Sequence, residues 1–582
     1  MRRVFASVFA AMMVGAVITT LAPAVHAADV PTDATWQEVY FPSRDGTMLH
    51  GDLLLPSDGC PEGGCPVVVS IGPYFGSGSG ENFPVYDPFN EGPIGRFYDF
   101  IAHDFPGRGN IFQQGYAWLQ VDSRGYGGSD GCNDYGGIGE QMDAASAVEW
   151  AGSQSWSNGK VGMWGKSYDG WTQVMALAQN PPHLEAVVIQ APLIEGYGIG
   201  YVNGVHHDAG WYATTSLYML YDFIPPSVNE MTPEEAVYPA KGTATDPCWV
   251  SQQALIAAGW DHDMEYWRER DLRPSARRND DVAVLWSHGF NDVNTKPDQI
   301  FGVYEHLNDM PKSNHRAWFG EWAHYRGNES QHTGRDGFLE EALDWFDHYL
   351  KGLPFRYEVN AQNVVEIQDN EGMWRTEAQY PPVDVRDVTL PLKPGTYVDD
   401  NNQSAGGGYW TFSQPLEYDL RAVQEPTLTV TAEFDLPYAN LVGVLYDYDP
   451  DSGRVQEVNR GAYRLEESGT AVSFRLHPRD HIFRAGHRLA FHMTSGHPEF
   501  LPYQTRQTVT VTEASISVRF LTYERISNLA GEPASSTSRS LAVTAAQLEA
   551  GTLEMPLPSD EIPYPDAETR EAIQPTVTTP AG

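Results

Sequence analysis

The stretch VGMWGKSYDGW, residues 161–171, places a serine where the sequence pattern changes from strand to helix. The apolar residues before Ser167 are typical of a buried strand, and YDGWTQVMALAQ, residues 168–179, is typical of a helix. Gly165 and Gly170 would allow a tight turn and a close approach of the helix to the strand. Ser167 is therefore either a nucleophile on a sharp turn or part of a glycine-rich turn without chemistry, and the rest of the chain decides between the two.

Short apolar runs and helical runs alternate on both sides of this stretch. The apolar runs are rich in β-branched and aromatic residues, as buried parallel strands are. Strands are expected at 65–74, 115–122, 160–165, 185–192, 281–289 and 315–322, and helices at 139–154 and 339–352. This alternation predicts a doubly wound α/β sheet domain over residues 28–353.

Three parts of the chain depart from that alternation. Residues 193–278 are rich in Trp and Tyr and mostly helical in pattern, which predicts a helical cap inserted into the sheet domain. Residues 354–560 contain alternating strands separated by Gly, Pro and Asp or Asn clusters, which predicts a C-terminal β-sandwich or jelly roll. Residues 561–582 are rich in Pro and Thr and are expected to form a flexible tail.

The N-terminus has the layout of a secretory signal peptide. Arg2 and Arg3 precede an apolar run, and small residues follow it, so residues 1–27 are expected to be removed on export to the periplasm or the medium. The net charge of the chain is −40, and it becomes −42 without the two arginines. An acidic surface repels nucleic acid and anionic membranes, so neither is expected as a partner. No later segment is long and apolar enough to span a bilayer.

Four cysteines suit an exported protein. Cys60 and Cys65 bracket the turn sequence PEGG, which predicts a disulfide between them and leaves Cys132 and Cys248 to form a second one. A structural zinc at these cysteines is disfavoured because no His or Cys pair flanks them at ligand spacing.

Two other segments have features of metal sites. DYDPDSG, residues 447–453, resembles the start of a calcium loop, but its glycine is one position late and Val458 replaces the bidentate glutamate, so a hairpin turn is expected. VHHDAG contains His206, His207 and Asp208, but adjacent residues rarely face one ion and no third ligand is indicated. The sequence therefore predicts neither a metal nor another cofactor.

A nucleophilic serine needs a base, and the base needs an orienting acid. Asp292 follows the predicted strand 281–289, and His324 comes at the end of the predicted strand after it. The carboxyl ends of parallel strands meet at one edge of a sheet, and the order Ser, Asp, His is that of the α/β-hydrolases. The sequence therefore predicts a nucleophile elbow at Ser167 and a catalytic triad of Ser167, Asp292 and His324.

The tetrahedral intermediate of such a reaction needs hydrogen-bond donors for its oxyanion. The backbone amide of Tyr168, which directly follows the nucleophile, is the first expected donor. The phenol of Tyr74, in the loop after the first parallel strand, is the second candidate, with a packing role as the alternative.

The chain resembles the cocaine esterase and X-prolyl dipeptidyl-peptidase group of serine hydrolases, peptidase family S15. Between about residues 36 and 550 the matching segments are GPY, VDSRGYGGSDG, VEWAGSQSWSNGKVGMWGKSYDGWTQ, HGFNDVNTKP, FGEWAH, DWFDHYLKGL and DHIFRAGHRLAFHMTSG. In that family the nucleophile elbow has the sequence motif G-x-S-Y-x-G, and residues 165–170 of this chain match it. The resemblance implies the α/β-hydrolase fold with a helical cap and a jelly-roll domain, and the site residues Ser167, Asp292, His324, Tyr74 and Tyr168.

The substrate class is less sharply defined by the sequence. HGFNDVNTKP looks most like the dipeptidyl-peptidase form of this loop, whereas α-amino-acid ester hydrolases carry acidic residues two and three positions after the triad aspartate, where Asn294 and Thr295 stand. The leading hypothesis is an exported X-Pro dipeptidyl-peptidase that acts through an acyl-enzyme on short peptides. A carboxylesterase or amidase for small substrates is the alternative, and a non-catalytic binding protein using the β domain is a third.

A dipeptidyl-peptidase must also bind the charged amino terminus of its substrate. A buried ammonium requires a carboxylate or several acceptors to offset its desolvation. The predicted cap supplies candidate acids for this subsite, namely Asp208, Asp222, Asp261, Asp263 and Glu265.

Overall fold

The computed structural model describes residues 31–74, 100–101, 103–207, 252, 254–256, 259–276, 279, 281–298, 315–356, 358–359, 364–500, 502–535 and 538–578. The predicted signal peptide therefore lies outside the described residues. The chain divides into two compact units, the first formed by residues 1–134, 146–161 and 217–250 and the second by 135–145, 162–216 and 251–582. Within the described ranges, no helix has the length and apolar character needed to cross a bilayer.

Four strands lie wholly within the first unit, in the order β1-β2-β4-β3. They are β1 (Ala34–Pro42), β2 (Met48–Pro56), β3 (Cys65–Gly72) and β4 (Ala117–Asp122). β1 and β2 pair antiparallel, as do β2 and β4, whereas β3 and β4 pair parallel. Every residue of β3 is buried, as its continuous apolar sequence predicts.

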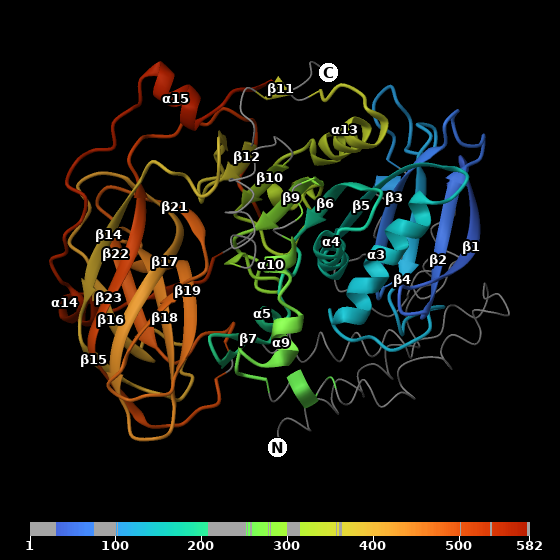
Figure 1. Cartoon of the computed structure of the whole chain (residues 1–582). Coiled ribbons are helices and arrows are strands. Elements are labelled where there is room, and N and C mark those ends of the chain that lie inside the picture. The colour runs from blue at the N-terminus through green and yellow to red at the C-terminus, as the bar shows by residue number, and fades with distance from the viewer. Residues whose placement is uncertain are drawn as a thin grey trace, which may run out of the picture. The chain divides into compact units, whose positions relative to one another are not determined.

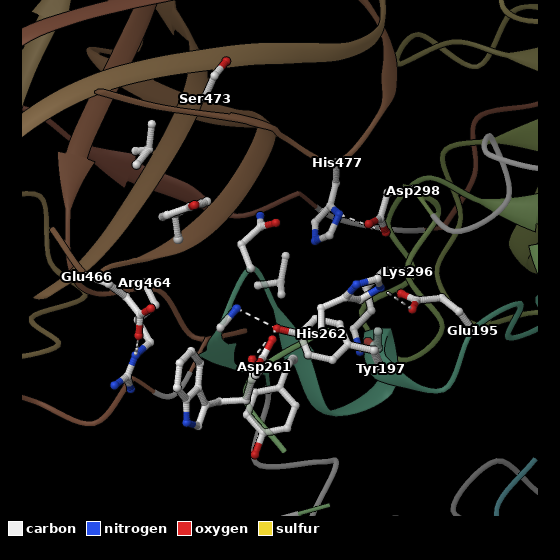
Figure 2. A pocket seen from close by; sticks show the side chains of 18 of the residues that line it. Glu195, Tyr197, Asp261, His262, Lys296, Asp298, Arg464, Glu466, Ser473 and His477 are labelled. Atoms are coloured by element: carbon white, nitrogen blue, oxygen red, sulfur yellow. Dashed lines mark hydrogen bonds and ion pairs between the residues drawn. The ribbon is translucent and has the colours of Figure 1, made fainter. Parts of the chain in front are cut away.

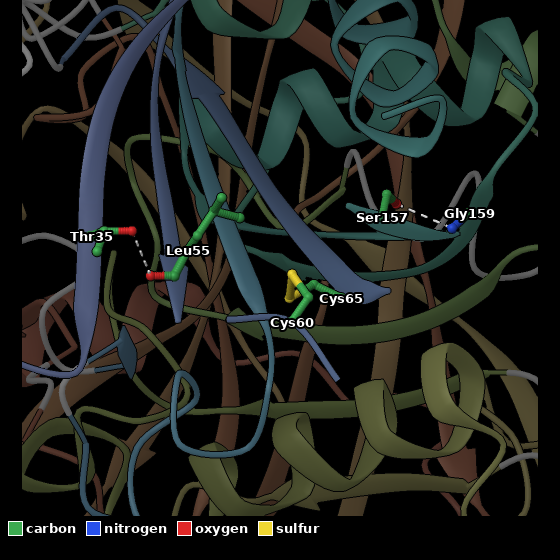
Figure 3. Close-up of a disulfide and its surroundings, with 6 residues drawn as sticks. All are labelled: Thr35, Leu55, Cys60, Cys65, Ser157 and Gly159. Carbon is green, nitrogen blue, oxygen red and sulfur yellow. Dashed lines mark hydrogen bonds between the residues drawn. A yellow bond between two sulfur atoms is a disulfide. The ribbon is translucent and has the colours of Figure 1, made fainter. Parts of the chain in front are cut away.

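The predicted disulfide between Cys60 and Cys65 is present in this unit, where it closes the turn that leads into β3 (Figure 3). The two Cα atoms are 5.0 Å apart, within the range that disulfides span. Cys132 is disulfide-bonded as well. Its expected partner Cys248 lies outside the described residues, so that pairing stays a prediction.

Strand β5 (Ser157–Lys166) and helix α3 (Ile138–Gly152) each begin in one unit and end in the other. The second unit continues with five strands in the order β6-β9-β10-β12-β13, which are β6 (Leu184–Gln190), β9 (Ala283–Gly289), β10 (His315–Gly320), β12 (Val364–Gln368) and β13 (Trp374–Glu377). The neighbouring pairs from β6 to β12 are parallel, and β13 is antiparallel to β12. These positions confirm the predicted parallel strands and helices to within a few residues.

Helices α4 (Tyr168–Gln179) and α13 (Phe338–Lys351) both pack against β6 (Figure 1). α13 approaches the sheet so closely that a Cβ atom at Gly162 would lie 2.6 Å from the ring of Phe346. The remaining short elements of this part are α5 (Tyr197–Gly200), β7 (Tyr201–Val202), β8 (Val205–His206), α9 (Glu265–Glu269), α10 (Arg273–Ala276) and α12 (Ser330–Thr333).

The C-terminal part of the second unit consists of two antiparallel sheets, drawn in yellow to red in Figure 1. One sheet has β14 (Val385–Leu392), β23 (Thr508–Leu521), β17 (Leu420–Glu433) and β20 (Ala471–Arg475), with β15 (Gly395–Val398) on β23 and β21 (Arg479–Phe483) on β17. The other has β16 (Gly408–Phe412), β22 (Arg488–Thr494), β18 (Ala439–Asp449), β19 (Arg454–Leu465) and β24 (Ser540–Ala542). Alternating residues of β17, such as Leu428 and Val430, meet Leu441 and Leu445 of β18 in a common core. This confirms the predicted C-terminal β domain.

The hairpin expected at residues 447–453 is confirmed. β18 and β19 pair antiparallel up to Asp449 and Arg454, and the amide of Asp451 donates to the Asp449 carboxylate within the turn. Asp447 instead lies within β18, where it bonds the rings of His481 and His487.

The structure departs from the predicted boundaries at two places. The sheet continues past residue 353, because β12 pairs parallel with β10 and carries β13 with it. The segment predicted to be a flexible tail instead contains helix α15 (Ala567–Ile573) and strand β25 (Val577–Thr578), which pairs with β11 (Glu358–Val359). Asp566 caps this helix by accepting from the amide of Thr569, a local signal that the Pro and Thr content obscured. Helix α14 (Ala545–Gly551) precedes it.

Candidate active site

Ser167 stands at the turn between β5 and α4, as the sequence predicts. Its backbone has φ 64° and ψ −119°, a combination that non-glycine residues rarely adopt, and the residue is 5% exposed. Its amide donates to the carbonyl of Gln190 at the end of β6, which fixes the turn to the neighbouring strand. Such a strained serine between strand and helix has the backbone form of a nucleophile elbow.

The two glycines of the turn are required by close packing. A Cβ atom on Gly165 would lie 2.4 Å from the Cβ of Asp169, and one on Gly170 would lie 2.9 Å from the carbonyl oxygen of Gln190. Both distances are too short for any side chain. The glycines flanking Ser167 therefore allow the helix to start directly against the sheet.

Asp292 follows β9 and is fully buried. Its carboxylate accepts hydrogen bonds from the amides of Asn294 and Thr295 at 2.8 and 3.0 Å, and from the Thr295 hydroxyl at 2.8 Å. Burial alone would raise the pKa of Asp292, but His324 and His288 beside it hold that pKa well below its ordinary value. The residue is therefore a buried, permanently charged acceptor.

His324 follows β10 and contacts this acceptor directly. Its Nδ1 lies 2.7 Å from the Oδ2 of Asp292, which orients the ring and leaves Nε2 as the second nitrogen. Burial lowers the pKa of His324 more than the carboxylate of Asp292 raises it. The imidazole is therefore neutral near pH 7 and able to accept a proton.

Buried polar contacts join the three segments that carry Ser167, Asp292 and His324. The Thr295 hydroxyl lies 2.9 Å from the carbonyl of Ala191, the residue after Gln190, and 3.3 Å from Nδ1 of His324. The side chain of Gln190 accepts from the amide of Gly327, three residues after His324. Lys166, next to the serine, donates to the carbonyl of His324 at 3.3 Å.

Sequence reasoning did not single out Gln190 or give Thr295 a role beside Asp292. The D-x-x-T pattern from Asp292 to Thr295 is a signal for the local turn, because Asp side chains accept from amides two and three residues later. Gln190 had no comparable signal, because its partners are distant along the chain.

The two predicted oxyanion donors are placed differently. Tyr168 is the first residue of α4, so its amide lies at the positive end of the helix dipole. Its phenol donates to the buried carboxylate of Glu140 at 2.6 Å, which anchors the start of the helix. Tyr74 follows β3 in the first unit and is 9% exposed. The roles of both residues in an oxyanion hole stay predictions.

The predicted amine subsite is tested only in part by the described residues. Asp208 and Asp222 lie outside them, whereas Asp261 lines a cavity of about 790 Å³ in the second unit (Figure 2). Glu195 lines the same cavity, and its Oε2 lies 3.5 Å from Nε2 of His262. Figure 2 draws this ion pair. No contact there identifies an ammonium subsite, so the assignment stays a prediction.

The two histidines at 206 and 207 have different environments. The ring of His206 packs against Tyr201, whereas Nε2 of His207 lies 3.0 Å from Oε1 of Glu499. His477 lies against the same carboxylate. The sequence indicates no third metal ligand near these two histidines. The fold brings two further candidate ligands, His477 and Glu499, next to His207, although both lie far from it along the chain.

The comparison with known proteins agrees with this fold. Residues 45–326 match the model of the X-Pro dipeptidyl-peptidase (S15) family. The chain is 23% identical over 518 residues to a provisionally assigned Xaa-Pro dipeptidyl-peptidase of Bacillus cereus, covering 78% of this chain and 84% of that protein. It is 24% identical over 440 residues to a provisionally assigned Xaa-Pro dipeptidyl-peptidase of Streptomyces avermitilis, covering 67% of this chain but only 60% of that protein.

A solved structure extends the similarity of fold over nearly the whole chain. A CocE/NonD family hydrolase from Staphylococcus aureus superposes with a TM-score of 0.65 at 15% identity, covering 86% of this chain and 99% of the other. The similarity includes the large mixed sheet and the antiparallel C-terminal domain, and it confirms the predicted fold class. Residues 45–326 are therefore similar to the X-Pro dipeptidyl-peptidase (S15) family, and the chain is a serine hydrolase with the α/β-hydrolase fold.

Proposed function

We propose that this chain is an exported X-Pro dipeptidyl-peptidase that acts through an acyl-enzyme on Ser167. The observation that carries the mechanism is the 2.7 Å contact between buried Asp292 and His324, joined by polar contacts to the strained turn at Ser167. Export is supported by the N-terminal sequence, the acidic composition and the disulfide between Cys60 and Cys65.

Each residue has a defined step in this mechanism. Nε2 of His324 takes the proton of Ser167 as its oxygen attacks the scissile carbonyl, and Asp292 stabilises the imidazolium that forms. The amide of Tyr168 and the phenol of Tyr74 donate to the oxyanion. His324 then returns the proton to the leaving amine, and water releases the dipeptide from Ser167 by the same steps.

The choice of a peptide over an ester substrate rests on two observations. The curated relatives reported above are assigned as Xaa-Pro dipeptidyl-peptidases. In addition, Thr295 stands where the α-amino-acid ester hydrolases carry an acid, and here it is buried and bonded to Asp292 rather than available to bind a substrate amine. The fold itself is shared with CocE/NonD family hydrolases, so a small ester is the alternative substrate.

A substrate panel separates these two functions. The purified protein is assayed on X-Pro-p-nitroanilides, on the same compounds with an acetylated amino terminus, and on p-nitrophenyl esters. The proposal expects the free X-Pro compounds to have the highest kcat/KM, and it expects acetylation to reduce it sharply because a buried ammonium subsite is left unpaired. Equal cleavage of blocked and free compounds, with faster ester hydrolysis, would establish the esterase instead.

The acyl-enzyme is tested at the nucleophile. Ser167→Ala should abolish labelling by a fluorophosphonate and lower kcat by roughly 10⁶-fold, the loss typical of a triad serine. A folded variant that retains near-normal turnover on every substrate would contradict the mechanism, whichever substrate class is preferred.

A further inference from the structure

Three buried side chains from separate segments converge in the second unit. They are His207, directly after β8, His477, between β20 and β21, and Glu499. All three are at most 5% exposed. Nε2 of His207 lies 3.0 Å and Nε2 of His477 lies 3.5 Å from Oε1 of Glu499, and the three ligand atoms lie within 4.8 Å of one another.

The two separations from Oε1 of Glu499 are close to those of atoms bound to one metal ion. Zn²⁺ binds imidazole nitrogen and carboxylate oxygen at about 2.0–2.1 Å, which puts neighbouring ligand atoms of a tetrahedral site about 3.3 Å apart. The two distances to Oε1 of Glu499 lie on either side of that value. A cation could therefore be bound with small rotations of side chains already in place.

Residues around the cluster orient the candidate ligands, as residues that surround a bound metal ion do. Oδ1 of Asp298 lies 3.2 Å from Nδ1 of His477, and Figure 2 draws this ion pair. The other ring nitrogen, Nε2, then faces Glu499. That Nε2 atom is buried and makes no hydrogen bond within the described ranges of the chain. Arg460 donates to Oε2 of Glu499 and, at 3.3 Å, to Oε1 as well, which fixes the orientation of the carboxylate beside the two rings.

We propose that His207, His477 and Glu499 bind one divalent transition-metal ion of the zinc class, with two imidazole nitrogens, one carboxylate oxygen and a water as ligands. Two nitrogens and one oxygen are the donor set that zinc uses when three protein ligands leave the fourth position to water. The role is structural, because none of these side chains contacts Asp292 or His324 in the described structure.

Such an ion would tie the segment around β7 and β8 to the β domain. Asn203, in the turn between β7 and β8, already donates to the carbonyl of Ala462 in β19, and its own carbonyl accepts from the amide of Arg464. His207 forms a backbone bridge with Phe500, next to Glu499. A bound ion would add bonds between two segments that are about 290 residues apart in sequence, as the separation of 292 between His207 and Glu499 shows.

The site is tested by metal analysis of the full chain. The protein is dialysed against a chelator, loaded with Zn²⁺, desalted and analysed for metal, and in parallel the chelated protein is titrated with Co²⁺. We expect about one zinc per chain, visible Co²⁺ bands of tetrahedral form that saturate at about one equivalent, and a Tm that rises with zinc concentration. Hydrolase activity is expected to persist in chelator, because the triad lies outside the site.

Substitutions locate the ion. His207→Gln and His477→Gln should each reduce bound zinc to less than about a tenth per chain, since three protein ligands become two. The matched control is His481→Gln, a buried histidine in β21 that bonds Asp447 at 3.0 Å and takes no part in the cluster, and it should keep the zinc. Near-UV circular dichroism verifies folding of each variant.

The rival arrangement is a network of ion pairs without metal. In that arrangement a protonated His477, with Arg460 and Lys296 nearby, neutralises Glu499 and Asp298. Absence of zinc and of Co²⁺ bands in the native chain would establish this network and overturn the proposal. Retention of zinc by folded His207→Gln and His477→Gln would overturn it too, and the Co²⁺ titration of the native chain decides the matter if those variants do not fold.

Discussion

At the scale of single residues, Thr295 connects the acid and the base of the candidate site. Its hydroxyl lies 2.8 Å from Oδ2 of Asp292 and 3.3 Å from Nδ1 of His324, and it is 1% exposed. A hydroxyl there stabilises the carboxylate and fixes the oxygen that orients the imidazole. In the proposed mechanism Thr295 is thus a positioning residue rather than a catalytic one.

Thr295→Val should therefore lower kcat/KM while leaving the chain folded. The substitution preserves size and branching but removes a hydrogen bond to a charged group, worth about 1.5–3 kcal/mol, which corresponds to a reduction of roughly 10- to 100-fold. Thr295→Ser keeps the hydroxyl and should restore most of the activity. Equal losses in the two variants, measured on the preferred substrate, would mean that the hydroxyl has no role in positioning.

The pH dependence of activity follows from His324. Its pKa is lowered from the ordinary 6.5 because burial disfavours the charged ring more than Asp292 favours it. In the proposed mechanism the neutral ring is the reactive form. A lowered pKa keeps it neutral to lower pH, so kcat/KM should fall only below pH 6.5. An acid limb with its midpoint above 6.5 would contradict this.

Asp292→Asn provides the complementary measurement. It removes the carboxylate that raises the pKa of His324, so the acid limb should move to still lower pH while kcat falls by about 10⁴-fold. A shift of the midpoint to higher pH would show that His324 is not the group that titrates.

At the scale of elements, the junction of β5 and α4 depends on glycine, because a side chain at Gly165 would collide with the start of α4. Gly165→Ala would put a Cβ atom 2.4 Å from the Cβ and 3.0 Å from the carbonyl oxygen of Asp169. Because backbone must move to relieve this contact, the free energy of unfolding should decrease by about 1–3 kcal/mol and fluorophosphonate labelling should slow.

A control glycine lies in the β domain. The nearest heavy atom to a Cβ on Gly406 is Oγ of Ser404 at 3.7 Å, so Gly406→Ala should change stability by less than about 0.5 kcal/mol. Thermal unfolding of both variants compares the two sites. If Gly165→Ala were as stable and as reactive as the native chain, the close approach of α4 to β5 would not be needed.

At the scale of the whole molecule, the β domain contributes a buried charge to the loop that carries His324. Arg479 of β21 bonds both oxygens of Glu321, which directly follows β10, and Glu321 also accepts from the side chain of Asn291, next to Asp292. Arg479 and Glu321 are 2% and 6% exposed. The C-terminal domain is thus bonded to the loop that carries the predicted base, and Glu321 of that loop is bonded in turn to the loop that carries the predicted acid.

Arg479→Met should destabilise the chain and reduce turnover. It leaves the carboxylate of Glu321 buried without its cation, at a cost of about 3–5 kcal/mol. Arg475→Met is the matched control, because Arg475 pairs with Glu425 on the surface with 63% of its side chain exposed, and its loss should cost less than about 1 kcal/mol. Chemical denaturation would contradict the prediction if the two variants proved equally stable.

The sequence by itself determined the features that depend on short patterns. The parallel strands of the sheet, such as β3 and β10, were predictable because buried strands need continuous apolar runs. The turn at Ser167 was predictable because it needs glycine at positions 165 and 170. The order of the Ser, Asp and His loops and the disulfide at Cys60 and Cys65 were likewise readable from local spacing.

Only the tertiary structure decided the contacts between distant segments. No periodic pattern in the sequence predicts these contacts, because the two partners of each lie far apart along the chain. They are the bonds of Gln190 to Ser167 and Gly327, the pair of Glu321 with Arg479, and the pairing of β12 with β10. The cluster at Glu499 is the clearest case. Nothing in the local sequence marks its two histidines and its glutamate as metal ligands. They become a candidate metal site because folding buries the three side chains next to one another, where buried polar atoms must bond to each other or to an ion.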